Sequence, residues 1–247
     1  MSIKQILFNT TDHFVITTYC KFLIFGTPFE KRKVEYMKIA VFGATGKTGI
    51  QVVQQALDQG LEVKAFVRDP QKMTIKNDKL SLVQGDVVKP EAVEAGVEGV
   101  DAVVVTLGPK PDAGNVMAEG TANIISSMKK HNVKRLIVQS SYPMSGSPEG
   151  MEFLRNQGMT DEQIASMLQP AIDDKVKQET ETRESGLDYL IIRPLILTDG
   201  EKTGMYRVGE KLDVKPGDTI SRADVADFML KSLTSDEWSG KTVVLAY

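Results

Sequence analysis

The run from Met37 to Gly49, MKIAVFGATGKTG, constrains the fold more than any other part of the chain. The apolar stretch from Ile39 to Phe42 predicts a buried strand, and an amphipathic segment directly after the glycines predicts a helix. Gly43, Gly46 and Gly49 lie between the two with GxxGxxG spacing, a variant of the GxGxxG fingerprint of dinucleotide-binding domains. The run therefore predicts a strand, a tight glycine turn and a helix.

Such a turn suits a phosphate for simple physical reasons. The N-terminus of a helix presents unpaired N–H groups and a partial positive charge. In the dinucleotide pattern Gly43 permits the tight turn, Gly46 lets the backbone approach a pyrophosphate, and Gly49 lets the helix pack close to the strand. The turn predicts a dinucleotide site, and the alternative is a purely structural glycine turn.

A rival interpretation is a P-loop, because Gly46-Lys47-Thr48 resembles the end of GxxxxGK[ST]. That motif requires a glycine five residues before Gly46, where this chain has Val41 inside the predicted strand. A β-branched strand residue does not form the nest of amides that a P-loop needs. The sequence therefore disfavours an NTPase.

The end of the second predicted strand, Leu61 to Val67, bears on the type of dinucleotide. An acidic residue there holds the ribose 2′-hydroxyl of NAD, whereas an arginine accommodates the 2′-phosphate of NADP. Arg68 comes first in this chain and Asp69 follows it. The planar guanidinium of Arg68 suits a phosphate, and Lys47 adds a second positive charge. The sequence predicts NADP(H), and the alternative is a solvated Arg68 beside an Asp69 that caps the next turn.

Charge and cysteine content exclude other classes of protein. The net charge of −3 gives no basic footprint for nucleic acid. One cysteine, Cys20, allows no internal disulfide and no multi-cysteine metal site. With only two histidines, His13 and His131, we expect no zinc site and no other metal.

Residues 1–36 differ from the rest of the chain, being rich in aromatics without a clean period. Asp12, His13 and Lys21 interrupt their apolar part, so a transmembrane helix is not expected. An A-x-A-like cleavage site is also missing. We expect an extension outside the fold, with a weak membrane-surface anchor as the alternative, and a cytoplasmic protein. The sequence indicates no oligomeric state.

From Met37 to Tyr247 strand and helix patterns alternate, which predicts one Rossmann-type α/β domain with a doubly wound parallel sheet. Strands are expected over 38–43, 61–67, 80–84, 102–107, 134–140, 187–193 and 242–246, and helices over 47–59, 90–97, 114–131, 174–185 and 222–233. Residues 143–169 are too long for a plain βα turn. Thr160 to Gln163 looks like a helix start, so this methionine-rich insertion is predicted to be a helical lid, or ordinary packing.

Ligands of such sheets bind beyond the carboxyl ends of the strands. Each strand end alone is more simply a turn or a cap, so their joint position at one edge is what predicts a site. The candidates are Asp86 and Val87 after the third strand, Leu107 and Gly108 after the fourth, Ser140, Ser141 and Tyr142 after the fifth, and Pro194, Leu195 and Ile196 after the sixth.

The motifs GATGKTG, VRDP, GDV, RLIVQSS, RESGLDYLIIRP and ISRADVADFML together resemble the atypical short-chain dehydrogenase/reductases of the NmrA-like NAD(P)-binding family, and within it the flavin reductase/biliverdin reductase B group. The resemblance covers nearly all of 37–247. The resemblance implies that the pyrophosphate is lined by Gly43, Thr45, Gly46, Lys47 and Thr48, and that Arg68 binds the 2′-phosphate. It implies that Asp86 and Val87 border the adenine, and that Leu107 and Gly108 border the ribose. Ser140 and Ser141 would face the nicotinamide, Pro194, Leu195 and Ile196 would flank it, and Lys175 would occupy a polar position before the ExxxRESG segment.

The chain also departs from related patterns. The Tyr-x-x-x-Lys pair of ordinary short-chain dehydrogenases is missing, because Gly146 stands four residues after Tyr142. The biliverdin reductase B pattern has histidines where this chain has Lys175 and Leu195, and its lid is shorter than the one predicted here. The resemblance therefore implies the cofactor more firmly than any one acceptor.

The first functional hypothesis is a reductase that passes hydride from NADPH to a flat electron-poor small molecule, such as a flavin, a quinone or a linear tetrapyrrole. Ser141 would donate a hydrogen bond to the acceptor, Tyr142 would stack on it or donate a proton, and Lys175 would supply positive charge near the developing anion. A non-catalytic NADP(H)-binding redox sensor is the alternative. An isomerase-type enzyme is disfavoured, since those rely on the Tyr–Lys pair.

Overall fold

The computed structural model describes residues 37–109 and 116–247, so the expected extension at 1–36 and the first residues expected in the 114–131 helix lie outside the described part. Ten strands form an eight-stranded sheet in the order β3-β2-β1-β4-β5-β6-β10-β8 and a separate pair, β7-β9. Their bounds are β1 Lys38–Phe42, β2 Glu62–Val67, β3 Leu80–Gln84, β4 Ala102–Val105, β5 Arg135–Gln139, β6 Asp188–Pro194, β7 Ile196–Thr198, β8 Arg207–Gly209, β9 Thr219–Ser221 and β10 Lys241–Ala246.

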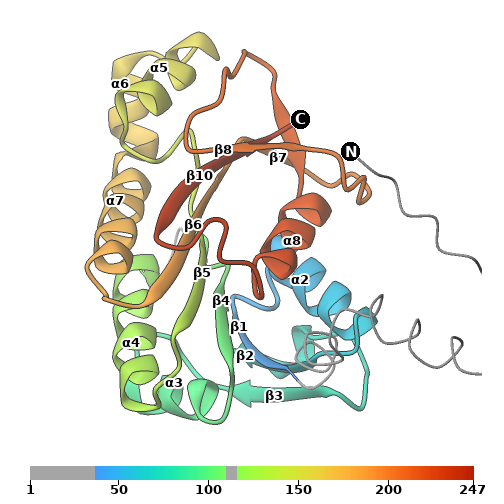
Figure 1. Ribbon diagram of the computed structural model, residues 1–247. Helices are drawn as coiled ribbons and strands as arrows, with labels where there is room; N and C mark the ends of the chain where they lie inside the picture. Colours follow the sequence, from blue (N-terminus) through green and yellow to red (C-terminus); the bar gives the residue numbers. More distant parts are fainter. Residues whose placement is uncertain (1–36, 110–115) are drawn as a thin grey trace, which may run out of the picture.

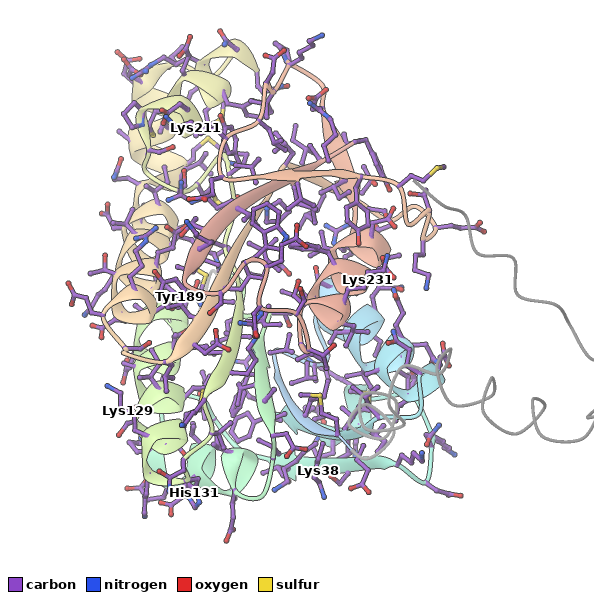
Figure 2. All side chains as sticks on the ribbon, in the orientation of Figure 1. Lys38, Lys129, His131, Tyr189, Lys211 and Lys231 are labelled. Atoms are coloured by element: carbon purple, nitrogen blue, oxygen red, sulfur yellow. The ribbon has the colours of Figure 1, made fainter. Side chains whose placement is uncertain are left out.

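Helices cover both faces of the sheet, which confirms the predicted Rossmann-like α/β fold in a single domain (Figure 1). One layer holds α2 (Lys47–Asp58) and α8 (Arg222–Lys231); the other holds α3 (Pro90–Val97), α4 (Val116–Lys130) and α7 (Gln169–Arg183). Many charged side chains lie on the outer surfaces, as Lys129 on α4 shows (Figure 2).

The side chains of β1 alternate between the two faces of the sheet, which explains why its sequence is apolar from Ile39 to Phe42. Ile39 and Val41 belong to the core under α2 and α8. Ala40 and Phe42 belong to the core under α3 and α4. All four side chains are fully buried, because a central parallel strand has a helical layer on each side.

The strand order places the glycine turn at the topological switch point. β1 pairs with β2 on one side and with β4 on the other, both in parallel. The connections after β1 and β4 run to opposite faces, since α2 lies on one and α4 on the other (Figure 1). A crevice at this point is where open α/β sheets bind their ligands.

The structure differs from the expected parallel pattern at its far edge. The short strand β8 pairs with β10 in the antiparallel direction, and β7 pairs with β9 beside the main sheet. None of these three-residue strands was expected from the sequence.

The insertion at 143–169 is helical, and Figure 1 shows it at the upper left, next to α7. It contains α5 (Pro148–Asn156), α6 (Asp161–Gln163) and a π-helical turn, Ile164–Leu168, that leads into α7. Thr160 and Gln163 form the reciprocal hydrogen bonds of a capping box, which confirms the predicted helix start. Met144, Met151 and Met159 pack around Leu154, Ile164 and Ile172, whereas Met167 is exposed.

Among the described residues no helix is both long and apolar enough to cross a bilayer.

Candidate functional site

The glycine turn after β1 leaves no space for side chains at two of its positions. Gly43 has a φ of +83°, and a Cβ there would lie 2.7 Å from the carbonyl oxygen of Thr106. A Cβ on Gly49 would lie 2.1 Å from the carbonyl oxygen of Gly43, closer than any real contact. The amide of Gly46 donates to that same oxygen at 2.9 Å, which closes the turn. Backbone contacts between β1, β4 and α2 therefore fix this loop.

The N-terminus of α2 has none of the usual side-chain partners. Its N-cap, Gly46, makes no side-chain cap hydrogen bond, and the first turn of the helix contains no acidic residue. Lys47 begins the helix with a largely exposed side chain, and its Nζ lies 2.8 Å from Oδ2 of Asp199. Thr48 is buried. The arrangement leaves a positive helix end and a cation at the mouth of the crevice.

Six of the predicted cofactor residues come together in one pocket beside this turn. Phe66, Val67 and Val116 complete its lining, and the six predicted residues are Gly43, Thr45, Arg68, Asp86, Val87 and Leu107. They come from the ends of β1 and β2 and from the segments that follow β3 and β4. The structure thus joins residues that are far apart in the sequence into one lined cavity.

Asp86 and Val87 lie in that pocket with defined surroundings. Oδ1 of Asp86 accepts from the amide of Val88 at 3.2 Å, so this carboxylate also holds its own turn. Val87 is buried against α4, where a Cβ on Gly120 would lie 2.7 Å from the methyl groups of Val87. Gly108, after Leu107, is exposed.

Arg68 and Asp69 have separate environments at the end of β2. Oδ1 of Asp69 accepts from the amide of Gln71 at 3.0 Å and caps the short turn Pro70–Lys72. The side chain of Arg68 is exposed and lines the pocket. In the part of the chain that the structure describes, no carboxylate lies within ion-pair distance of Arg68.

Lys175 on α7 is buried below the carboxyl ends of β4 and β5. Its Nζ donates to the carbonyl oxygens of Leu107 and Gln139, each at 3.1 Å, and to Oε1 of Gln178 at 3.0 Å. Burial lowers the pKa of Lys175 to about 8, although the nearby carboxylates of Asp174 and Glu179 act in the opposite direction. The amine can therefore gain or lose a proton near neutral pH.

Ser140, predicted to contact the nicotinamide, has its hydroxyl engaged by a carboxylate inside the protein. It is buried, and its Oγ donates to Oε1 of Glu179 at 2.6 Å. Arg193 donates to the same carboxylate through Nε at 2.9 Å and Nη2 at 2.6 Å, and Arg183 pairs with it from the next turn of α7. The hydroxyl of Ser140 is held by this network because a buried carboxylate requires several donors.

This network around Glu179 was not predicted from the sequence. Burial raises the pKa of Glu179, but hydrogen bonds and charge from Arg193, with help from Ser140 and Arg183, hold it below the usual value. A usable signal was present, since Glu179 stands one helical turn after Lys175 on α7 and Arg193 is a charged residue near the end of the apolar strand β6.

Tyr142 and Leu195 belong mainly to a small core. The ring of Tyr142 packs edge-on against Phe153 at 5.8 Å between centroids, and the expected stacking of an acceptor on it stays a prediction. Burial raises the pKa of the Tyr142 phenol, and Glu149 adds to the rise while Arg193 opposes it. Leu195 is 2% exposed in the same cluster.

The other predicted residues on this side have mixed positions. Ser141 is half-buried, and its Oγ accepts from the amide of Met144 at 3.4 Å. Pro194 is buried at the end of β6, whereas Ile196 is 38% exposed at the start of β7. Ser141 and Ile196 thus keep the accessible surface that contact with a ligand requires.

The crevice fits a dinucleotide by its chemistry. Three features favour phosphate groups. The glycine turn at Gly43 and Gly49 has no space for a Cβ, the N-terminus of α2 is uncapped, and Lys47 and Arg68 supply two cations. Over the described residues no three side chains of His, Cys, Asp and Glu gather as metal ligands would.

A family model described as NAD(P)H-binding matches residues 43–236, which begin at the glycine turn. The match confirms the predicted cofactor as a nicotinamide dinucleotide, NAD(P)(H), while the choice of NADP(H) over NAD(H) stays a prediction. An uncharacterized chloroplastic protein of Arabidopsis thaliana is 32% identical over 226 residues, covering 85% of this chain and 76% of that protein. The photosystem II assembly factor Ycf39 of Trieres chinensis is 26% identical over 224 residues, covering 85% of this chain and 63% of the factor.

Solved structures share the fold. The oxidoreductase ylbE from Lactococcus lactis superposes with a TM-score of 0.70 at 23% identity, covering 85% of this chain and 90% of that one. The anaerobilin reductase ChuY of Escherichia coli O157:H7 also has a TM-score of 0.70, at 22% identity, covering 85% of this chain and 96% of that one. The cytoplasmic location expected from the sequence stays a prediction, because the similar proteins include chloroplastic ones.

Proposed function

Because this chain belongs to the NAD(P)H-binding family, we propose that it is an NADPH-dependent reductase that passes hydride to a flat, electron-poor small molecule. One observation carries the proposal. Arg68 lines the same pocket as the glycine turn with no described carboxylate to neutralise it, while Asp69, the residue that would favour NAD, caps its own turn.

The proposed roles follow the geometry of the crevice. The amides at the start of α2, together with Lys47, bind the diphosphate, and Arg68 binds the 2′-phosphate. Asp86 and Val87 border the adenine, and Leu107 and Gly108 border the ribose. When bound, NADPH supplies a hydride from C4 of its nicotinamide.

Lys175 is the residue best placed to assist the chemistry. Its Nζ is held at the carbonyl ends of β4 and β5, and in the protonated form it places a positive charge at the edge of the sheet where the acceptor would become anionic. Ser141, with its partly accessible hydroxyl, donates a hydrogen bond to the acceptor. Tyr142 keeps a role as a proton donor. Flat acceptors can also take a proton from water, so the missing Tyr–Lys pair does not argue against a reductase.

A non-catalytic NADP(H) sensor is the second candidate. The observation that favours it is the packing on the acceptor side, where Ser140, Tyr142 and Leu195 are all buried. One of the similar proteins is a photosystem assembly factor, which is a second reason to keep this candidate.

The experiment that separates the two candidates is NADPH oxidation with FMN, menadione and biliverdin offered separately. Biliverdin is included because one structural neighbour is an anaerobilin reductase. Turnover of any acceptor supports the reductase. Tight NADPH binding without turnover of any of them supports the sensor.

Replacing Arg68 by alanine tests the cofactor assignment. Since charge-assisted hydrogen bonds to phosphate contribute about 1.5–3 kcal/mol, Arg68→Ala should weaken NADPH binding roughly 10- to 100-fold and NADH binding little. Titration calorimetry measures both affinities. Arg155→Ala is the matched control, because Arg155 is an exposed arginine that pairs with Asp161 on the insertion. Equal losses for NADPH and NADH would show that Arg68 does not hold the 2′-phosphate.

A further inference from the structure

Asp199 lies directly against the glycine turn, although the sequence analysis gave it no role. The register of β7 and β9 pairs Thr198 with Ser221, which brings the next residues, Asp199 and Arg222, side by side. Nη1 of Arg222 donates to Oδ1 of Asp199 at 2.5 Å. On its other oxygen Asp199 accepts from Nζ of Lys47 at 2.8 Å. The carboxylate therefore bridges the first residue of α2 and the first residue of α8.

The segment that carries Asp199 is anchored by buried groups. The fully buried carboxylate of Asp224 accepts from the amides of Thr203 at 2.9 Å and Gly204 at 2.8 Å. Oγ of Ser221 donates to the carbonyl oxygen of Glu201 at 3.2 Å. The position of Asp199 is thus set by β7, β9 and α8.

The ion pair itself remains open to exchange. The side chains of Lys47 and Asp199 are 71% and 63% exposed, so water and other anions can reach both. The hydrogen bond from Lys47 lowers the pKa of Asp199, burial opposes it, and the charge of Arg222 lowers the pKa further, so the carboxylate is ionised at neutral pH. Exposed pairs of this kind are weak, and a competing anion with more charge can displace them.

We propose that Asp199 sets the affinity of the dinucleotide site, as an internal counter-anion that competes with the diphosphate for Lys47 and Arg222 and so weakens cofactor binding. The inference rests on the proposed function, which places the diphosphate at the start of α2. α2 supplies no acidic residue of its own in its first turn, so Asp199 is the carboxylate that a bound diphosphate meets there. By holding these two cations, Asp199 lowers cofactor affinity and hastens cofactor release.

The test is the affinity of the full-length variant Asp199→Asn for NADPH, measured by titration calorimetry. The amide keeps the shape of the side chain and removes its charge, so we expect binding to tighten about three- to tenfold. The gain should shrink at about 0.5 M salt, where exposed charges are screened. Asp199→Ser is a second variant that must change the affinity in the same direction.

Glu201→Gln is the matched control. It removes the same charge from the same segment, but the Glu201 carboxylate is exposed and makes no ion pair or hydrogen bond within the described residues. We expect its NADPH affinity to equal that of the parent chain. Adenosine 2′-monophosphate is the matched ligand, because it carries the 2′-phosphate without a diphosphate, and Asp199→Asn should leave its affinity unchanged.

A double-mutant cycle with Lys47→Met tests whether Asp199 acts through Lys47. In the Lys47→Met background, Asp199→Asn should tighten NADPH binding by a smaller factor than in the parent chain. If Asp199→Asn binds NADPH no more tightly than Glu201→Gln does, the inference is wrong and the proposed function still stands. A parent chain that binds no NADPH overturns both.

Discussion

At the scale of single residues, burial decides what each predicted side chain can do. Ser140 illustrates this, because its partner Glu179 lies 39 residues away and no local pattern joins the two. Lys175 is equally buried, yet its Nζ is held by two carbonyl oxygens at the strand ends, beside the proposed site. The sequence identified Lys175 as a polar position, but only packing gives its amine an altered pKa.

The pH dependence of turnover tests the role of Lys175. Because burial lowers its pKa to about 8, the amine is charged below that pH and neutral above it. If the charge stabilises the developing anion, kcat should fall as pH rises through about 8. Lys175→Met should lower kcat tenfold or more at pH 7 and remove this decline. A decline that persists in Lys175→Met would assign the titration to another group.

At the scale of elements, periodic apolar patterns predicted the strands and helices that enclose the core, such as β1 and α2, because burial alone specifies them. The three-residue strands β7, β8 and β9 carry no such pattern. They exist through pairing, as in the register of β7 with β9 and of β8 with β10. The sequence therefore predicted the glycine turn but not the strand that brings Asp199 to it.

Replacing Gly49 by alanine tests how closely α2 must approach β1. The new Cβ would overlap the carbonyl oxygen of Gly43 at 2.1 Å, and backbone on both sides limits relaxation. We expect a loss of about 2 kcal/mol or more in the free energy of unfolding, measured with urea, together with weaker NADPH binding. Gly108→Ala is the stability control, because a Cβ there meets nothing within 4 Å. Equal stability of the two variants would contradict the close packing at the turn.

At the scale of the whole molecule, buried carboxylates tie the two helical layers to the sheet. Glu179 joins α7 to the ends of β5 and β6 through Ser140 and Arg193. Asp224 joins α8 to the C-terminal Tyr247, whose hydroxyl donates to it at 2.7 Å. In the folded state the pKa values of Glu179 and Asp224 both lie below their usual range. Burial raises each pKa, but hydrogen bonds outweigh it, chiefly from Arg193 to Glu179 and from Tyr247 to Asp224.

These carboxylates should make the fold sensitive to acid. A lowered folded pKa stabilises the protein fully above the unfolded value, about 4.3 for a glutamate, and that stabilisation disappears as pH falls through the folded pKa. Glu179→Gln leaves Arg193 without its charge partner, so at pH 7 we expect a loss of about 3 kcal/mol in the free energy of unfolding. The difference from the parent chain should narrow as pH is lowered, because acid protonates Glu179 in the parent. Urea unfolding at several pH values measures this. The control is Glu181→Gln, a half-buried glutamate of the same helix whose carboxylate makes no ion pair within the described residues. A constant difference between parent and Glu179→Gln at every pH would mean that the charge of Glu179 contributes nothing to stability.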